Sequence, residues 1–180
     1  MSLVSSTRDR TSGSLDVVTL RLGQDTLAIR AGLIREVLEP VAITRVPGAP
    51  EFCTGLVNVR GTVVPLADLR VIFGMHRGPV GPDTRILVLD LSMEGRAAVV
   101  GIIADAVHEV TRISQDSLQD VPAVGTSWPA QFVEAIANRD SSVVMIPDLP
   151  AIFASALSTQ ATPVSSHSGG TQLPPHQLDR

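Results

Sequence analysis

The chain has few of the residues that usually define a compartment or a cofactor. Among 180 residues there is one cysteine, Cys53, no tyrosine, and an aromatic fraction of only 3%. A single thiol excludes an internal disulfide and a pair of cysteine metal ligands, and it is typical of a reducing compartment. The core must therefore be built mainly from Val, Ile, Leu and Ala.

Basic charge and long apolar runs are also missing. The formal net charge is -4, so the chain has no basic field of the kind that attracts nucleic acids or acidic membranes. The longest apolar run, residues 97–104, is less than half of the roughly 20 residues that a bilayer span needs. No apolar segment of a signal peptide follows the N-terminal charges. We expect a cytoplasmic protein without direct membrane insertion and without a nucleic-acid partner.

Sequence motifs of common enzymes are absent as well. The chain contains no phosphate-binding Gly-rich loop before a helix, and no G-x-S-x-G, C-x-x-C or H-E-x-x-H. His76 and His108 have no Ser or Cys partner at a recognisable spacing. The sequence therefore predicts no catalytic residues, no metal and no cofactor, which disfavours an enzyme.

The two ends of the chain differ in composition from its middle. Residues 1–14 are rich in Ser, Thr and Arg, and residues 158–180 are rich in Ser, Thr, Pro, Gly and Gln. Neither segment has apolar periodicity, which predicts disordered tails. The folded domain is predicted over residues 15–157. A Gly- and Pro-rich loop within residues 76–84 marks the predicted boundary between two halves of this domain.

Short apolar stretches between turn residues predict β-hairpins. The predicted pairs are residues 15–22 with 26–29, 85–91 with 97–103, and 132–137 with 142–146. Residues 107–113 predict a further strand, and residues 31–37 predict a short turn that runs into a strand carrying Glu36.

Residues 55–73 combine a strand, a turn, a second strand and a short helix. Gly61 supplies the positive φ of the turn at Arg60-Gly61, and Pro65 is expected to close the second strand because it cannot donate to a ladder. Asp68 is expected to cap the helix, as is Asp148 before the last helix. Arg60 is the one cation at the turn, and the fold is expected to bring Glu36 close to it.

The chain also contains an internal repeat. VVPLADLRVIF at 63–73 aligns with VVMIPDLPAIF at 143–153, and IREV at 34–37 aligns with VHEV at 107–110. Each half supplies about five short strands and a closing helix, which predicts an all-β fold of two small antiparallel barrels with a docking groove between them. In this alignment Arg60-Gly61 faces Asp140-Ser141, so the arginine belongs to one copy only.

The motif GLVNVRGTVVPLADLR closely resembles the signature of the bacterial chemotaxis coupling family CheW. The resemblance extends over about residues 15–153 and includes IREVLEP and VVGIIADAVHEV. It implies two SH3-like five-stranded β-barrel subdomains. It also implies a non-enzymatic adaptor that joins the cytoplasmic tip of a methyl-accepting chemoreceptor to the regulatory domain of the histidine kinase CheA.

Family motifs carry site residues over to this chain. The residues implied for receptor binding are Ile34, Glu36, Gly55, Asn58 and Arg60. Ile34 would dock a receptor helix, Glu36 and Arg60 would steer it, and Gly55 would set the backbone shape. Kinase binding is implied near Gln119 and Val124, although QDVPAV departs from the charged and aromatic character expected there. Ring assembly with CheA or with further copies is a further expectation.

Two alternatives stay open. A similar adaptor could serve a twitching pilus or another receptor-kinase array. A small β-barrel enzyme or nucleic-acid-binding module is the other, although acidic charge, scarce aromatics and the lack of a catalytic constellation count against it.

Overall fold

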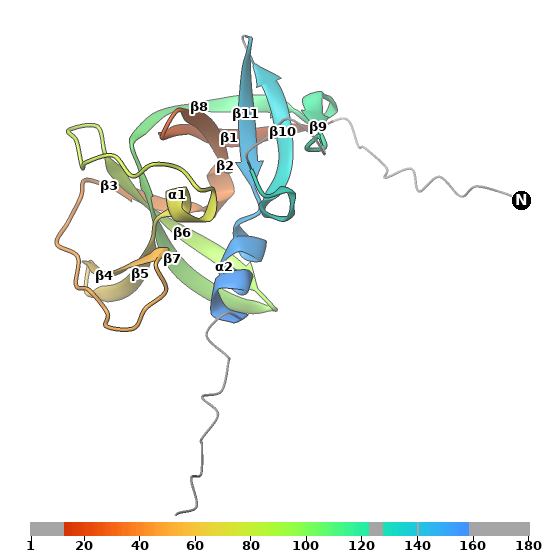
Figure 1. The fold of residues 1–180 in the computed structure, drawn as a ribbon. Coiled ribbons are helices and arrows are strands. Elements are labelled where there is room, and N and C mark those ends of the chain that lie inside the picture. The colour runs from red at the N-terminus through yellow and green to blue at the C-terminus, as the bar shows by residue number, and fades with distance from the viewer. Residues whose placement is uncertain (1–12, 123–127, 140, 159–180) are drawn as a thin grey trace, which may run out of the picture.

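The computed structural model describes residues 13–122, 128–139 and 141–158. These residues form two β-sheets, here called sheet A and sheet B, and two α-helices. Sheet A has the strand order β8-β1-β2-β11-β10-β9, and sheet B has the order β3-β6-β7-β5-β4. Figure 1 shows sheet A above sheet B, with α1 near their junction and α2 lying across β6 and β7. The predicted all-β fold with two sheets is confirmed.

The elements follow the chain closely. Sheet A contains β1 (Ser14–Leu22), β2 (Asp25–Arg30), β8 (Ala106–Ser114), β9 (Leu118–Gln119), β10 (Val133–Arg139) and β11 (Ser142–Pro147). Sheet B contains β3 (Ile34–Leu38), β4 (Cys53–Val59), β5 (Thr62–Ala67), β6 (Arg85–Met93) and β7 (Arg96–Ala104). The helices are α1 (Leu69–Ile72) and α2 (Leu149–Ser158), and 3-10 turns cover Ala31–Leu33, Gln115–Ser117 and Ala130–Phe132. The predicted hairpins are all present.

Two details of the predicted sheets are wrong. Sheet A has six strands, because β9 adds a short edge to β10. Neither sheet is wholly antiparallel, since β2 pairs with β11 and β5 pairs with β7 in parallel. The partners in each parallel ladder come from different hairpins, so no tight turn forces them to run in opposite directions.

The predicted division of the chain into two separate halves is also wrong. The N-terminal hairpin β1–β2 pairs with β8 and β11, whereas the later hairpin β6–β7 pairs with β3 and β5. Residues 76–84 connect α1 to β6, and the strands before and after this loop contribute to both sheets. The internal repeat is nevertheless visible: β3-β6-β7-β5-β4 matches β8-β1-β2-β11-β10 strand for strand. Each repeat has exchanged its first hairpin with the other.

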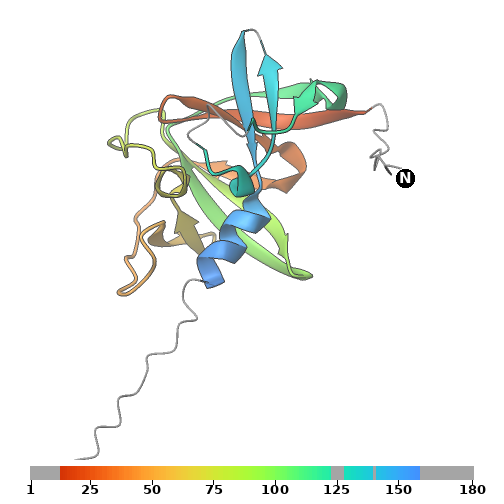
Figure 2. The same cartoon turned by 45° about the vertical axis from the view of Figure 1, so that its right-hand side comes forward.

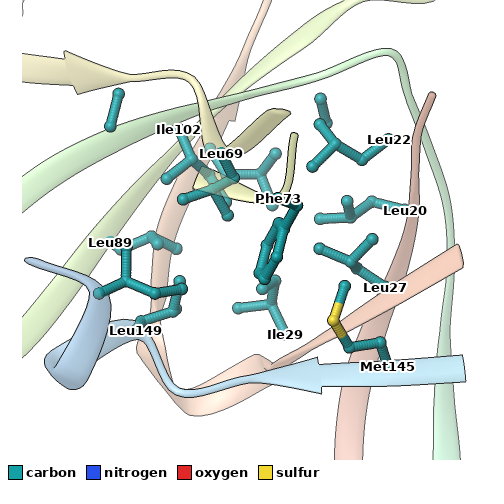
Figure 3. Close-up of a cluster of buried hydrophobic side chains, with 14 of the residues drawn as sticks. Leu20, Leu22, Leu27, Ile29, Leu69, Phe73, Leu89, Ile102, Met145 and Leu149 are labelled. Carbon is teal, nitrogen blue, oxygen red and sulfur yellow. The ribbon is translucent and has the colours of Figure 1, made fainter. Parts of the chain in front are cut away.

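A single hydrophobic cluster joins the two sheets. Leu20, Leu22, Leu27 and Ile29 from sheet A face Leu89 and Ile102 from sheet B across Phe73. Leu69 lies beside Ile102, and Leu149 lies beside Leu89 (Figure 3). These side chains are almost completely buried. Burial of each large aliphatic side chain contributes about 1.5–3 kcal/mol, so the sheets stabilise each other and fold as one unit.

Both predicted helix caps are confirmed, and they repeat in detail. The Asp68 carboxylate accepts a hydrogen bond from the backbone N–H of Arg70 at 3.0 Å, and Asp148 accepts from that of Ala151 at 2.9 Å. The backbone N–H of Asp68 donates to Phe52 at 2.8 Å, and that of Asp148 donates to Phe132 at 2.9 Å. Each helix is thereby tied to the start of its own hairpin.

The prediction that Pro65 closes β5 is wrong. The strand continues to Ala67, and Pro65 pairs with Leu56 of β4. The parallel ladder with β7 involves only Leu66 and Ala67. Pro65 has no N–H to donate, and the pairing with β7 starts only after it.

The predicted disordered tails lie outside the described residues apart from Gly13, Ser14 and Ser158. Ser14 is the first residue of β1, and Ser158 is the last residue of α2. None of the helices within the described residues is both long enough and apolar enough to cross a membrane.

Candidate partner-docking site

The β4–β5 hairpin ends in a tight turn that places Arg60 at its tip. Arg60 has φ 51° and Gly61 has φ 84°, as a type I′ turn requires. The side-chain oxygen of Asn58 accepts a hydrogen bond from the backbone N–H of Gly61 at 2.8 Å. A positive φ costs an arginine about 1 kcal/mol or more, and Gly or Asn would suit the turn better. The turn itself does not require an arginine at this position, so the presence of Arg60 points to a role for its side chain.

Glu36 meets Arg60 across the two edges of sheet B. The Nε of Arg60 donates to Oε2 of Glu36 at 3.0 Å, which confirms the predicted proximity. Because β3 and β4 stand at opposite ends of the strand order, this contact shows that the sheet curls until its edges meet. The Arg60 side chain is 81% exposed and that of Glu36 is 19% exposed. A surface pair contributes at most about 1 kcal/mol, so the guanidinium stays open to a partner.

The strands next to this ion pair also expose valine and isoleucine side chains to solvent. Val63 on β5 is 63% exposed, and β3 with the segment after it exposes Val37, Val41, Ile43 and Val46 at 40–42% each. An exposed charge among exposed aliphatic side chains is typical of protein interaction surfaces. We call Glu36, Arg60 and these side chains the sheet B face.

Gly55 has a structural role in this face. A Cβ atom at Gly55 would lie 2.4 Å from the backbone oxygen of Thr44, and its φ of 147° is one that L-residues rarely adopt. Thr44 and Leu56 exchange two backbone hydrogen bonds of 2.8 Å at this point. Gly55 is buried, and its close approach to Thr44 is in line with the predicted effect on backbone shape.

The other residues carried over by motif are distributed between the two sheets. Ile34 is half-buried against the main core and pairs with Leu89, so it supports β3 beneath Glu36. Gln119 lies exposed in β9 of sheet A, where it pairs with Ile136. Val124 lies outside the described residues. The structure therefore brings Glu36, Asn58 and Arg60 together and leaves Gln119 on the other sheet.

Sheet A carries a second ion pair that the sequence reasoning missed. Nη2 of Arg139 donates to Oε1 of Glu109 at 2.7 Å, and Glu109 is the repeat equivalent of Glu36. Arg139 does not lie in the turn: it is the last residue of β10, pairs with Ser142 and is the repeat equivalent of Val59, which confirms that only one copy has an arginine in the turn itself. Val110 and Val143, the equivalents of Val37 and Val63, are 70% and 46% exposed.

A buried charge network was also missed. Arg70 donates to both carboxylate oxygens of Asp68 at 2.8 and 2.9 Å and to Asp105 at 2.8 Å. Asp105 accepts in turn from the backbone N–H of Gly23 in the β1–β2 turn at 2.6 Å. Hydrogen bonding to Asp68 raises the pKa of Arg70; burial opposes this shift, and attraction to both carboxylates adds to it. The network links α1 to sheet A, and the repeat has Pro150 in place of Arg70.

Metal-ligand clusters and cavities complete the description of the described residues. No group of three or more His, Cys, Asp or Glu side chains in these residues is arranged as metal ligands would be. A cavity of about 480 Å³ lies between the β1–β2 turn and the loop after α1. A smaller cavity of about 170 Å³ lies between sheet B and α2. The site can bind and orient a partner.

Comparisons with known proteins identify the family. A family model described as CheW-like domain matches residues 16–157. A probable chemotaxis protein CheW of Rhizobium etli is 26% identical over 83% of this chain and 94% of its own length. Protein PilI of Pseudomonas aeruginosa is 27% identical over 68% of this chain and 67% of its own length.

A solved structure gives the same answer. The crystal structure of the scaffolding protein TtCheW from Thermoanaerobacter tengcongensis is similar with a TM-score of 0.67 and 33% identity. The match covers 76% of this chain and 90% of that protein. Fold, family model and relatives agree, and the chain belongs to the CheW family of chemotaxis coupling adaptors.

Proposed function

We propose that this chain couples the cytoplasmic tips of methyl-accepting chemoreceptors to the regulatory domain of CheA, and that its sheet B face binds the receptor. The observation that carries the proposal is Arg60, which occupies a strained turn position, is 81% exposed and is oriented by Glu36. The chain would contribute binding rather than catalysis. It would work in the cytoplasm, at membrane-associated receptor arrays.

We expect both charged and apolar contacts with the receptor at this face. A carboxylate of the receptor can take the open side of the Arg60 guanidinium, while Val63 and Val37 offer apolar contact. An exposed pair of this kind steers association and is screened by salt within about 10 Å at 0.1 M ionic strength. Receptor binding is therefore expected to weaken as salt rises.

The kinase would bind on the other sheet. Family resemblance assigns this contact to Gln119 and Val124, and Gln119 lies exposed on β9 of sheet A. One docking face on each sheet would let this chain and kinase domains, or further copies of the chain, alternate in a ring. The match to PilI favours a second candidate function, coupling in a pilus-associated array. Loss of swimming or of twitching in a deletion strain separates the two pathways.

Titration of the wild-type chain with a receptor cytoplasmic fragment and, separately, with the CheA regulatory domain tests the proposal. Arg60→Glu and Glu36→Arg should each weaken receptor binding by about tenfold or more, which is about 1.4 kcal/mol, with an unchanged fold. Receptor binding like wild type in both variants would refute the assignment of the face. Loss of kinase binding alone would move the kinase to this face, and absence of binding to either partner by the wild type would refute the adaptor role.

A further inference from the structure

Strand β7 has an open edge along its first residues. It pairs with β6 along its whole length, whereas its parallel ladder with β5 begins only at Leu66 and Gly101. Within the part of the chain that the structure describes, residues 96–100 of β7 and 62–65 of β5 therefore have no strand partner on the sides that face each other.

Pro65 explains where this ladder begins. Its repeat equivalent, Met145, pairs with Leu27 in the parallel ladder of sheet A. Pro65 has no N–H to donate, so the corresponding position in sheet B lacks a donor for a bond to β7. The open edge is a consequence of this proline.

The backbone of β7 can accept a further strand at this edge. The β6–β7 turn has two residues, both with positive φ, so its closing pair, Met93 with Arg96, is hydrogen-bonded. Hydrogen-bonded pairs alternate along an antiparallel ladder, so Ala97 and Val99 direct their N–H and C=O groups away from β6 and toward the open edge. An added strand can pair with both of these residues.

The composition of this edge favours such pairing. Proteins usually protect an edge strand with charges, prolines or bulges. Residues 97–100 of β7 are Ala-Ala-Val-Val, without charge or proline, and the β6–β7 register has no bulge. We therefore expect an extended segment to cover this edge.

An apolar pocket of about 170 Å³ lies beside the edge. Its walls include Val99 of β7, Pro65 of β5 and Phe153 of α2, together with Cys53. An engineered apolar cavity of about 150 Å³ is large enough to hold benzene, so this pocket has room for a valine side chain. A strand paired with β7 would direct every second side chain toward the face on which the pocket lies.

The end of α2 brings a segment of the chain itself to this place. Figure 2 shows α2 lying across the β6–β7 hairpin. Phe153 lines the pocket, and α2 ends at Ser158, which is about 8 Å further along the helix axis at 1.5 Å per residue. Residues 159–180 follow Ser158, so they begin close to the pocket.

This C-terminal sequence contains a short stretch that suits an edge strand. Thr162 and Val164 are β-branched residues two apart, with Pro163 between them. Residues two apart in a strand share one face and one hydrogen-bonding side. If Thr162 and Val164 pair with β7, Pro163 therefore has its missing N–H on the solvent side, where an edge strand tolerates proline. The six residues from Ser158 to Val164 can span about 20 Å, which is enough to return to the pocket.

We propose that residues 162–164 add a strand to the open edge of β7 and that the Val164 side chain fills the pocket. The added strand pairs with Ala97 and Val99 and shields the edge from pairing with other chains. Because the segment is tethered to α2, its effective concentration at the edge is on the order of 1 mM, so even a weak contact is occupied most of the time. This inference does not depend on receptor or kinase binding.

The chain contains its own reporter for the pocket. Cys53 is the only cysteine in the sequence, so its reaction with iodoacetamide can be followed in the purified full-length chain. Val164→Asp should speed this reaction by about fivefold or more, because a charged side chain does not enter an apolar pocket. Ser165→Asp adds the same charge on the opposite face of the proposed strand and should change the rate by less than about twofold. Equal rates in the wild type and Val164→Asp would overturn the proposal.

Hydrogen exchange, measured by NMR on the same proteins, tests the strand itself. The amide N–H groups of Ala97 and Val99 should exchange about tenfold or more slowly in the wild type than in Val164→Asp, whereas those of Ala98 and Val100, which face β6, should differ by less than about twofold. Faster alkylation without faster exchange would contradict the added strand, as would equal exchange in both proteins. Protection that rises with protein concentration would assign the edge to a second copy of the chain and would also overturn the proposal.

Discussion

The two sheets share a strand order and differ in what they present to solvent. Both hairpins carry an arginine that binds a glutamate from an edge strand, within the turn in β4–β5 and beside the turn in β10–β11. In sheet B the arginine is the exposed member, with Arg60 at 81% and Glu36 at 19%. In sheet A the glutamate is more exposed, with Glu109 at 59% and Arg139 at 34%. Equivalent scaffolds therefore offer a cation on one face and a carboxylate on the other, so they suit partners of different charge.

Other differences between the repeats follow from what each position touches. Gly55 lies against the segment that crosses β4, and its equivalent Ala135 has room for a Cβ. Arg70 links α1 to Asp105, while its equivalent Pro150 lies exposed in the first turn of α2. The repeats thus provide matched controls, since one substitution at two equivalent positions isolates the effect of the surroundings.

The largest effect is expected at the two helix caps. Asp148→Ala removes a cap and should cost about 1 kcal/mol of unfolding free energy. Asp68→Ala removes the same cap and also leaves Arg70 without its main buried partner, so it should cost about 3–5 kcal/mol. Urea unfolding of both variants measures the difference. Equal losses would show that the buried network contributes nothing beyond capping.

The charge state of Arg70 adds a pH test to this comparison. Its pKa is raised in the folded chain, so the stability that its charge contributes is complete below the pKa of the unfolded state. This contribution is lost only as the pH rises through the still higher pKa of the folded state. The gap between Asp68→Ala and wild type should therefore be the same at neutral and at mildly alkaline pH, and a gap that closes there would contradict the assignment.

A smaller effect is expected where the segment after β3 crosses β4. Gly55→Ala should destabilise the chain by about 2–4 kcal/mol, because the new Cβ would clash with the Thr44 carbonyl and the φ is unsuited to alanine. The reciprocal change, Ala135→Gly, should cost only about 0.5–1 kcal/mol through backbone entropy. Thermal unfolding followed by circular dichroism compares the two. Similar losses would mean that the close approach at Thr44 is not rigid.

The smallest effect on stability is expected at the hairpin tips. Arg60 and Ser141 both have positive φ, so Arg60→Gly and Ser141→Gly should relieve strain and change the unfolding free energy by no more than about 1 kcal/mol. Only Arg60→Gly should weaken receptor binding, because it alone removes a side chain from the sheet B face. A matching loss of affinity in Ser141→Gly would place the receptor on both faces.

Local features of this fold were predictable from the sequence, whereas contacts between distant segments were less so. Hairpins, caps and the repeat depend on neighbouring residues, which is why the strand-turn-strand-helix unit at residues 55–73 was recognised. The pairing of Glu36 with Arg60 was predicted because Arg60 is the one cation at the turn of an apolar hairpin and the fold was expected to bring Glu36 close to it. The exchange of the β1–β2 and β6–β7 hairpins between the repeats was not predicted. The alternation of apolar and polar residues identifies strands and their hairpins but does not show which sheet each hairpin joins.

The missed charges have the same explanation. In the sequence, Arg70 looks like an ordinary helix residue. Its partner Asp105 and the β1–β2 turn are distant in the sequence and close to it only in the structure. Arg139 was overlooked because it lies at the end of β10, beside the turn, where the first copy has Val59. Pro65 was interpreted by its missing N–H alone, and its position beside the end of the β7 ladder became clear only from the sheet order.

The central claim is that the receptor binds the face of sheet B and not its equivalent on sheet A. Titration of one receptor cytoplasmic fragment with the variants Arg60→Glu and Arg139→Glu tests it directly, after circular dichroism has shown that both are folded. We expect the dissociation constant to rise about tenfold or more for Arg60→Glu and less than about twofold for Arg139→Glu. Equal losses, or a larger loss for Arg139→Glu, would contradict the account.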